Sequence, residues 1–112
     1  MGDLVSPYLT ELRRGTLMLA VLSQLKTEQY GYSLVQALEA SGIAIDQSTL
    51  YPLLRRLEKQ ELVTSTWDTT ESRPRKYYVL TDLGGQVLDE LYREWKQLST
   101  NLHQLLEGGT PS

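Results

Sequence analysis

The chain has 112 residues, a formal net charge of −3 at pH 7, one histidine and no cysteine. This length suits one folding unit with a modest core, and the lack of cysteine excludes disulfides, thiolate catalysis and cysteine-based zinc sites. No apolar run reaches membrane-spanning length and no signal-peptide pattern opens the chain, so we expect a cytoplasmic protein with no membrane partner.

Two helices are predicted in the first third of the chain. Apolar residues recur at three- and four-residue steps over residues 9–25, which indicates a helix that follows Pro7. A second helix is expected over residues 30–41, and Gly42 is a suitable left-handed stop for it.

A third helix with two different faces is predicted for residues 46–61. One face is an apolar stripe made of Leu50, Leu53, Leu54 and Leu57. The opposite face carries polar and cationic side chains, namely Ser48, Tyr51, Pro52, Arg55 and Lys59. Either Asp46 or Ser48 can accept the free amide hydrogens at the start of the helix. Helix, tight turn and helix is the arrangement of a helix-turn-helix, although a solvated amphipathic helix has the same pattern.

A basic β-hairpin is predicted to follow. Residues 62–67 and 76–81 are rich in strand-forming side chains and are separated by the turn-prone residues 68–74. The tip carries Arg73, Arg75 and Lys76. A helix whose first turns reach base edges, with later cations on phosphates, is typical of a duplex-reading element. Helix and hairpin together favour DNA binding.

The charge of the chain is partitioned in a way that agrees with this interpretation. Six of the eleven lysines and arginines lie between Arg55 and Lys76, whereas ten of the fourteen acidic residues lie outside that window. The field at a contact surface depends on local charge rather than on the total. The acidic total therefore does not exclude nucleic acid.

The last helix, predicted for residues 82–107, has the clearest periodicity. Its large apolar residues follow steps of 3, 4, 3, 4 and 3, at Leu88, Leu91, Trp95, Leu98, Leu102 and Leu105. This stripe is a seam for a partner helix. A second chain can cover it, or it can pack on the first helix of its own chain, and both can hold at once. Residues 108–112 are expected to be a disordered tail.

These elements predict a mainly helical fold with a small β-hairpin. Residues 1–81 would form a winged helix-turn-helix domain, and residues 82–107 would form a long C-terminal dimerisation helix.

Several short motifs occur in one order along nearly the whole chain: Gly15-Thr16-Leu17, Tyr30-Gly31-Tyr32, Thr49-Leu50-Tyr51-Pro52, Arg56-Leu57-Glu58, Arg75-Lys76-Tyr77-Tyr78 with Leu80-Thr81, Gly84 and Trp95. In these motifs the chain resembles a short-form member of the PadR family of bacterial transcriptional regulators. It departs from the family pattern at Ser48 and Glu61, where glycine is common.

The resemblance implies a winged helix-turn-helix homodimer that exchanges its C-terminal helix, acts as a repressor and often senses a small molecule. It implies base reading by Ser48, Thr49 and Tyr51, groove and backbone contacts by Arg55 and Arg56, and a wing contact by Lys76. The residues above add the remaining members of the predicted DNA-binding set, which are Pro52, Lys59, Arg73 and Arg75.

The chain is also similar to the lactococcal multidrug-binding type of regulator in this family, in which one tryptophan per subunit forms a flat aromatic pore at the dimer centre. Trp95 falls at that place, and Tyr92, Leu9 and Thr16 would be neighbouring walls. Paired indoles can sandwich planar, often cationic ligands. Alternatively, Trp95 fills the dimer core.

We expect no enzymatic activity, cofactor or metal. His103 has no obvious partner, and no phosphate loop, metal-ligand cluster or nucleophile–base arrangement occurs. The favoured function is a DNA-binding transcriptional repressor released by an effector at the dimer interface. The alternative is a winged-helix protein-interaction module without DNA specificity, whose binding would depend less on salt.

Overall fold

Three helices form the centre of the computed structural model, which describes residues 2–108. They are α1 (Gly2–Gln24), α2 (Gly31–Ala40) and α3 (Gln47–Lys59). All four leucines of the predicted α3 stripe are buried, together with Leu22 of α1 and Leu34 of α2. Burying one such side chain contributes about 1.5–3 kcal/mol, so this stripe fixes α3 to the core.

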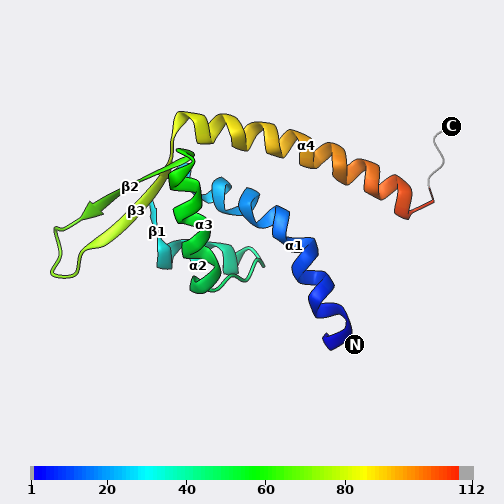
Figure 1. The fold of residues 1–112 in the computed structure, drawn as a ribbon, viewed down its shortest axis with the longest axis horizontal. Coiled ribbons are helices and arrows are strands. Elements are labelled where there is room, and N and C mark those ends of the chain that lie inside the picture. Colours follow the sequence, from blue (N-terminus) through cyan, green and yellow to red (C-terminus); the bar gives the residue numbers. More distant parts are fainter. Residues whose placement is uncertain (1, 109–112) are drawn as a thin grey trace.

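A short strand converts the predicted hairpin into a three-stranded antiparallel sheet. β1 (Gln29–Tyr30) pairs with β3 (Arg75–Leu80), and β3 pairs with β2 (Val63–Asp68). The order β1-β3-β2 makes β3 the central strand, and its Tyr78 is buried in the core. Because β1 has only two residues, its sequence cannot show the alternation of apolar and polar side chains that predicts a strand. We call β2, β3 and the connecting residues 69–74 the wing; it lies at the left of Figure 1.

The ends of α2 and α3 both use a left-handed residue. Gly42 has a φ of 86°, as its predicted role after α2 requires. After α3 the same role falls to Glu61, which has a φ of 64°. The amide of Leu62 donates to the carbonyl of Leu57 at 3.0 Å and closes the turn. A side chain in this conformation costs about 1 kcal/mol, so α3 ends here against the preference of glutamate.

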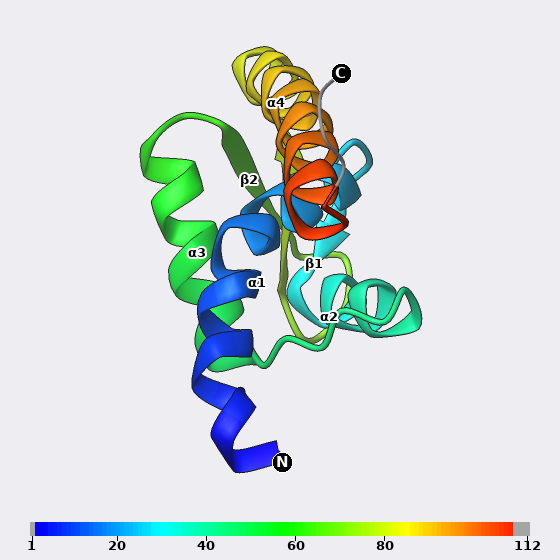
Figure 2. The ribbon, with the colours of Figure 1, turned by 90° about the vertical axis from the view of Figure 1, so that its right-hand side faces the viewer.

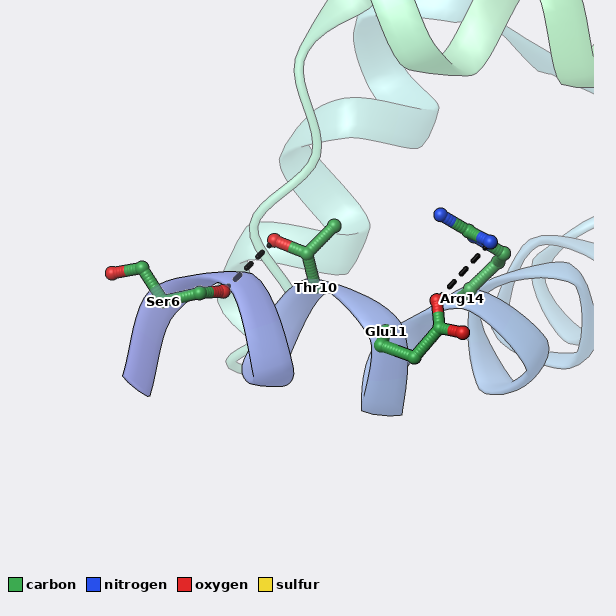
Figure 3. Close-up of polar contacts among 4 residues, drawn as sticks. All are labelled: Ser6, Thr10, Glu11 and Arg14. Atoms are coloured by element: carbon green, nitrogen blue, oxygen red, sulfur yellow. Dashed lines mark hydrogen bonds and ion pairs between the residues drawn. The ribbon is translucent and has the colours of Figure 1, made fainter. Parts of the chain in front are cut away.

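α1 is longer than the sequence predicts. It begins at Gly2 rather than near residue 9, and Pro7 lies inside the helix instead of before it. Pro7 is the sixth residue of α1, where proline cannot donate the usual hydrogen bond to the carbonyl four residues earlier, yet the helix continues through it. Thr10 donates to the Ser6 carbonyl at 3.1 Å and so joins the added part to the predicted helix, and Arg14 pairs with Glu11 at 3.1 Å (Figure 3). All of these contacts are internal to α1.

The long helix α4 (Asp82–Leu106) crosses the core and then leaves it. Its Leu88 is buried and Leu91 is half-buried, and this part of α4 packs on α1. In Figures 1 and 2 the remainder of α4 and the N-terminal half of α1 project from the body and diverge. The molecule is elongated, at 61 × 36 × 23 Å, with the wing at the opposite end. Most of the tail expected at 108–112 lies outside the described residues.

Candidate nucleic-acid interface

Asp46 holds the start of α3. Its Oδ1 accepts hydrogen bonds from the Ser48 hydroxyl at 2.6 Å and from the backbone amide of Thr49 at 2.9 Å. Both bonds stabilise the charged carboxylate and so lower the pKa of Asp46, and the bond from Ser48 has the largest effect. Asp46 is therefore the N-cap, while Ser48 and Thr49 remain exposed on the first turn.

An exposed cationic surface runs along α3 beyond that turn. Arg55, Arg56 and Lys59 are all exposed, and none of them forms an ion pair with another residue of the described part of the chain. Pro52, the sixth residue of α3, is exposed on the same side. These cations are free to neutralise phosphates.

Tyr51 does not lie on the outer face of α3, which corrects the prediction for this residue. It is half-buried against the core, and its hydroxyl reaches the start of α2. A Cβ atom on Gly31 would lie 2.1 Å from the Tyr51 hydroxyl oxygen, so any larger residue there would force the Tyr51 ring to move. At the usual helical rotation, residue 51 lies about 100° from Leu50, at the border between the two faces.

Two arginines of the wing are exposed, Arg73 and Arg75. The Arg75 guanidinium lies 4.7 Å from the centre of the Tyr30 ring, and Tyr30 meets Tyr77 edge to face at 5.5 Å. The pKa of Arg75 is raised, mainly because the negative charge of Glu71 stabilises the charged guanidinium. The stacking directs Arg75 toward the start of α2.

Like Arg75, Lys76 lies on β3 rather than at the hairpin tip, which is a second correction. It is half-buried, and its Nζ lies 3.6 Å from Oε1 of Glu58 on α3. The same Nζ lies 5.5 Å from the ring centre of Tyr78 and 6.0 Å from that of Trp67. This lysine already has partners within the protein.

A depression of about 690 Å³ lies between the start of α2, α3 and the wing. It brings together four residues of the predicted DNA-binding set: Tyr51, Arg73, Arg75 and Lys76. Four aromatic residues outside the predicted set line it as well: Tyr30, Tyr32, Trp67 and Tyr78. Trp67 of β2 pairs with Lys76 of β3. The predicted ranges of the two strands do not define which residues pair, so this neighbour of Lys76 could not be predicted.

A second, mainly apolar depression of about 360 Å³ lies between α1 and α4. Three of the four residues predicted for an effector line it, namely Thr16, Tyr92 and Trp95, whereas Leu9 is not among its lining residues. The rings of Tyr92 and Trp95 are stacked, 6.5 Å apart with 17° between their planes. Lys26 and Asp89 are its charged lining residues.

The apolar stripe of α4 divides into a covered part and an uncovered part. Leu88 and Leu91 pack within the chain, as the intramolecular alternative requires. Trp95, Leu98, Leu102 and Leu105 are 42%, 57%, 52% and 77% exposed. Four large apolar side chains in one exposed stripe are unusual on the surface of a single soluble chain.

Residues 18–90 match the Transcriptional regulator PadR-like family. The chain belongs to this family. A transcriptional regulator of Mycobacterium tuberculosis strain H37Rv is 32% identical over 90 residues, or 80% of this chain and 84% of the relative. An uncharacterized protein of Lysinibacillus sphaericus is 33% identical over 75% of this chain and 81% of its own length.

Solved structures of PadR-like proteins have the same fold. A PadR family transcriptional regulator from Eggerthella lenta is 52% identical, superposes with a TM-score of 0.88 and covers 94% of both chains. A PadR-like regulator from Bacillus cereus is 32% identical with a TM-score of 0.77, over 86% of this chain and 96% of that one. The predicted winged-helix class is confirmed.

Membership of the PadR-like family makes this protein a DNA-binding transcriptional regulator, in a family of regulators rather than enzymes. Regulators of the family are typically dimers. Within residues 2–108, no helix is long and apolar enough to cross a membrane. The same residues contain no cluster of three or more histidine, cysteine or acidic side chains that would hold a metal ion.

Proposed function

We propose that the protein is a sequence-specific repressor that reads DNA with α3 and the wing. The observation that carries this proposal is the exposed cationic surface formed by Arg55, Arg56 and Lys59 on α3 and Arg73 and Arg75 on the wing. Ser48 and Thr49, exposed on the first turn of α3, would meet base edges, and the later cations would meet phosphates. Such a regulator works in the cytoplasm.

We further propose that residues 1–81 form the DNA-binding unit and residues 82–107 the dimerisation helix. A second copy would cover the exposed stripe of α4 and also the N-terminal half of α1, where Leu4, Tyr8 and Leu12 are 74%, 74% and 72% exposed. In such a dimer the two α3 helices should lie about 34–36 Å apart, the length of one turn of DNA. The operator should be a palindrome with that spacing.

Arg55→Ala and Lys76→Ala test the DNA-binding assignment. Operator sites are first obtained by sequencing the genomic fragments that the purified wild-type protein retains, and affinities are then measured at several salt concentrations. Arg55→Ala should weaken operator binding by about 1–3 kcal/mol if Arg55 reads a base. If Arg55 meets a phosphate instead, the variant should reduce by about 1 the slope of log affinity against log salt concentration, which we call the salt slope. Lys76→Ala should reduce the slope.

Arg14→Ala is the matched control, because Arg14 is an exposed arginine on α1 that pairs with Glu11. It should leave operator affinity unchanged. If neither Arg55→Ala nor Lys76→Ala differs from this control, the assignment of α3 and the wing is wrong. Wild-type binding that is insensitive to salt would instead favour a protein-interaction module.

We also propose that a planar aromatic small molecule binds between α1 and α4 and releases the repressor. The stacked rings of Tyr92 and Trp95 and the apolar depression beside them support this. The volume of about 360 Å³ falls within the usual range of ligand sites, roughly 300–1,000 Å³. In the assembled dimer the partner would contribute a second copy of these rings.

Titration with planar aromatic cations should quench tryptophan fluorescence and weaken operator binding in parallel. Trp67 contributes background emission, so Trp95→Phe is the informative variant: it should abolish most of the quenching. Trp67→Phe is the matched control and should retain it. Quenching that persists in Trp95→Phe and disappears in Trp67→Phe would place the ligand at the wing and refute the effector site.

A further inference from the structure

Glu58 links α3 to both long strands of the wing. Among the described residues, its contact with Lys76 is the one ion pair that joins two different secondary-structure elements, since the other pairs lie within α1 and within α4. One carboxylate oxygen of Glu58 faces Lys76 on β3, and the other accepts a hydrogen bond from the Ser65 hydroxyl on β2. The carboxylate is thus shared by the two strands.

The position of Glu58 on α3 explains this role. Helical rotation places residue 58 about 80° from Leu50, on the same flank as Tyr51 and between the buried stripe and the outer face. The side chains of Glu58 and Lys76 are 34% and 33% exposed, so their contact is half-shielded from water. A buried leucine at position 57 holds the helix turn against the core beside it.

The pairing distinguishes Lys76 from the other wing cations. Arg73 and Arg75 are exposed, whereas the Lys76 ammonium faces a carboxylate and two aromatic rings. A carboxylate offers a cation the same charge and the same acceptor chemistry as a DNA phosphate. Partly exposed ion pairs are weak, so a phosphate in the right place can replace the carboxylate.

We propose that Glu58 is a positioning residue that holds the wing at a fixed angle to α3 and competes with DNA phosphate for Lys76. This inference rests on the proposed DNA-binding function and adds a source of specificity to it. Lys76 leaves Glu58 for a phosphate only when DNA fits α3 and the wing at that angle. Binding to unrelated DNA depends on phosphate contacts alone, and Lys76 would contribute nothing to it because this lysine stays paired with Glu58.

Glu58→Gln tests the proposal, because glutamine keeps an oxygen for the Ser65 hydroxyl but loses the charge. Lys76 should then contact phosphate on any duplex. The salt slope for non-operator DNA should steepen by about 0.9, so the rise in affinity over the wild type should be about threefold larger at 50 mM than at 200 mM salt. Operator affinity should rise less, because the angle of the wing is no longer fixed. The ratio of operator to non-operator affinity should therefore fall.

Glu61→Gln is the matched control: it removes the same charge three residues further on, from an exposed side chain without an ion pair among the described residues. It should change the slope much less. Glu58→Asp is a second variant that keeps the charge but is shorter by one methylene, which withdraws it from Lys76. Its slope should be intermediate, and an unchanged slope would overturn the proposal.

A double-mutant cycle with Lys76→Gln shows whether Glu58 acts through Lys76. In the Lys76→Gln background, Glu58→Gln should no longer change the salt slope. The proposal is wrong if the slope change persists there, or if Glu58→Gln behaves as Glu61→Gln does. A wild-type protein that binds no DNA would refute the proposed function itself, whereas wild-type binding with an unaffected Glu58→Gln variant would refute only the role of Glu58.

Discussion

We expect Leu98→Asp to sediment as a monomer at concentrations where the wild-type protein is a dimer. Leu98 is 57% exposed in the single chain and stands in the middle of the uncovered stripe of α4. In a two-fold interface each subunit would bury one aspartate without a partner. An uncompensated buried charge costs about 3–5 kcal/mol, so the dimer dissociation constant should rise by at least two to three orders of magnitude.

Operator binding should fall with dimerisation, because a monomer engages one half-site only. Thr100→Asp is the matched control, since it introduces the same charge two residues later, about 200° around the helix. That variant should remain a dimer and bind the operator. A Leu98→Asp protein with an unaltered dimer mass would show that the subunits associate through a different surface.

The second large effect is expected from Gly84→Ala in the first turn of α4. Thr81 caps this helix: its hydroxyl oxygen accepts from the Gly84 amide at 3.0 Å and donates to the Glu61 carbonyl at 2.7 Å. The amide of Thr81 donates to the Leu62 carbonyl at 3.1 Å. These bonds press the helix start against the backbone that connects α3 to β2.

A Cβ atom on Gly84 would lie 1.9 Å from the carbonyl oxygen of Leu62, a backbone atom that cannot move aside as a side chain does. The helix start and its capping bonds must therefore shift. We expect the free energy of unfolding to fall by about 3 kcal/mol or more. In thermal denaturation this corresponds to a loss of about 10–20 °C in Tm, at equal protein concentration.

The adjacent residue supplies the control. Apart from its chain neighbours and the backbone of its own helix, no heavy atom of the described residues lies within 4 Å of a Cβ atom placed on Gly85, so Gly85→Ala should gain the helix preference of alanine, about 0.5–1 kcal/mol. Its Tm should rise by a few degrees. Equal Tm values for the two variants would contradict the close packing of Gly84 against Leu62.

Much of the fold could be predicted because the relevant signals are local. The spacing of the leucines in α3 and α4 gives helix and buried face from neighbouring residues alone. The turn-prone residues 68–74 separate two strands in the same way. Pro7 misled the prediction of α1, since proline favours the start of a helix, whereas here it is the sixth residue.

The candidate interface was predictable only in outline. The sequence places cations on α3 and on the wing, but the side chains at the borders of the faces depend on what lies opposite them. Tyr51 turns toward the start of α2 because Gly31 leaves space there. Lys76 turns toward α3 because Glu58 offers it a carboxylate.

By itself, the sequence determined the four helices apart from the start of α1, the two long strands, the residues that form the core of α3, and where the positive charge is concentrated. Periodicity and composition are properties of contiguous residues, so no knowledge of packing was needed. The tertiary structure alone decided the pairing of β1 with β3, the contact of Gly84 with Leu62 and the link from Glu58 to Lys76 and Ser65. Each of these joins separate elements of the chain, and their geometry follows from how the helices and the sheet pack.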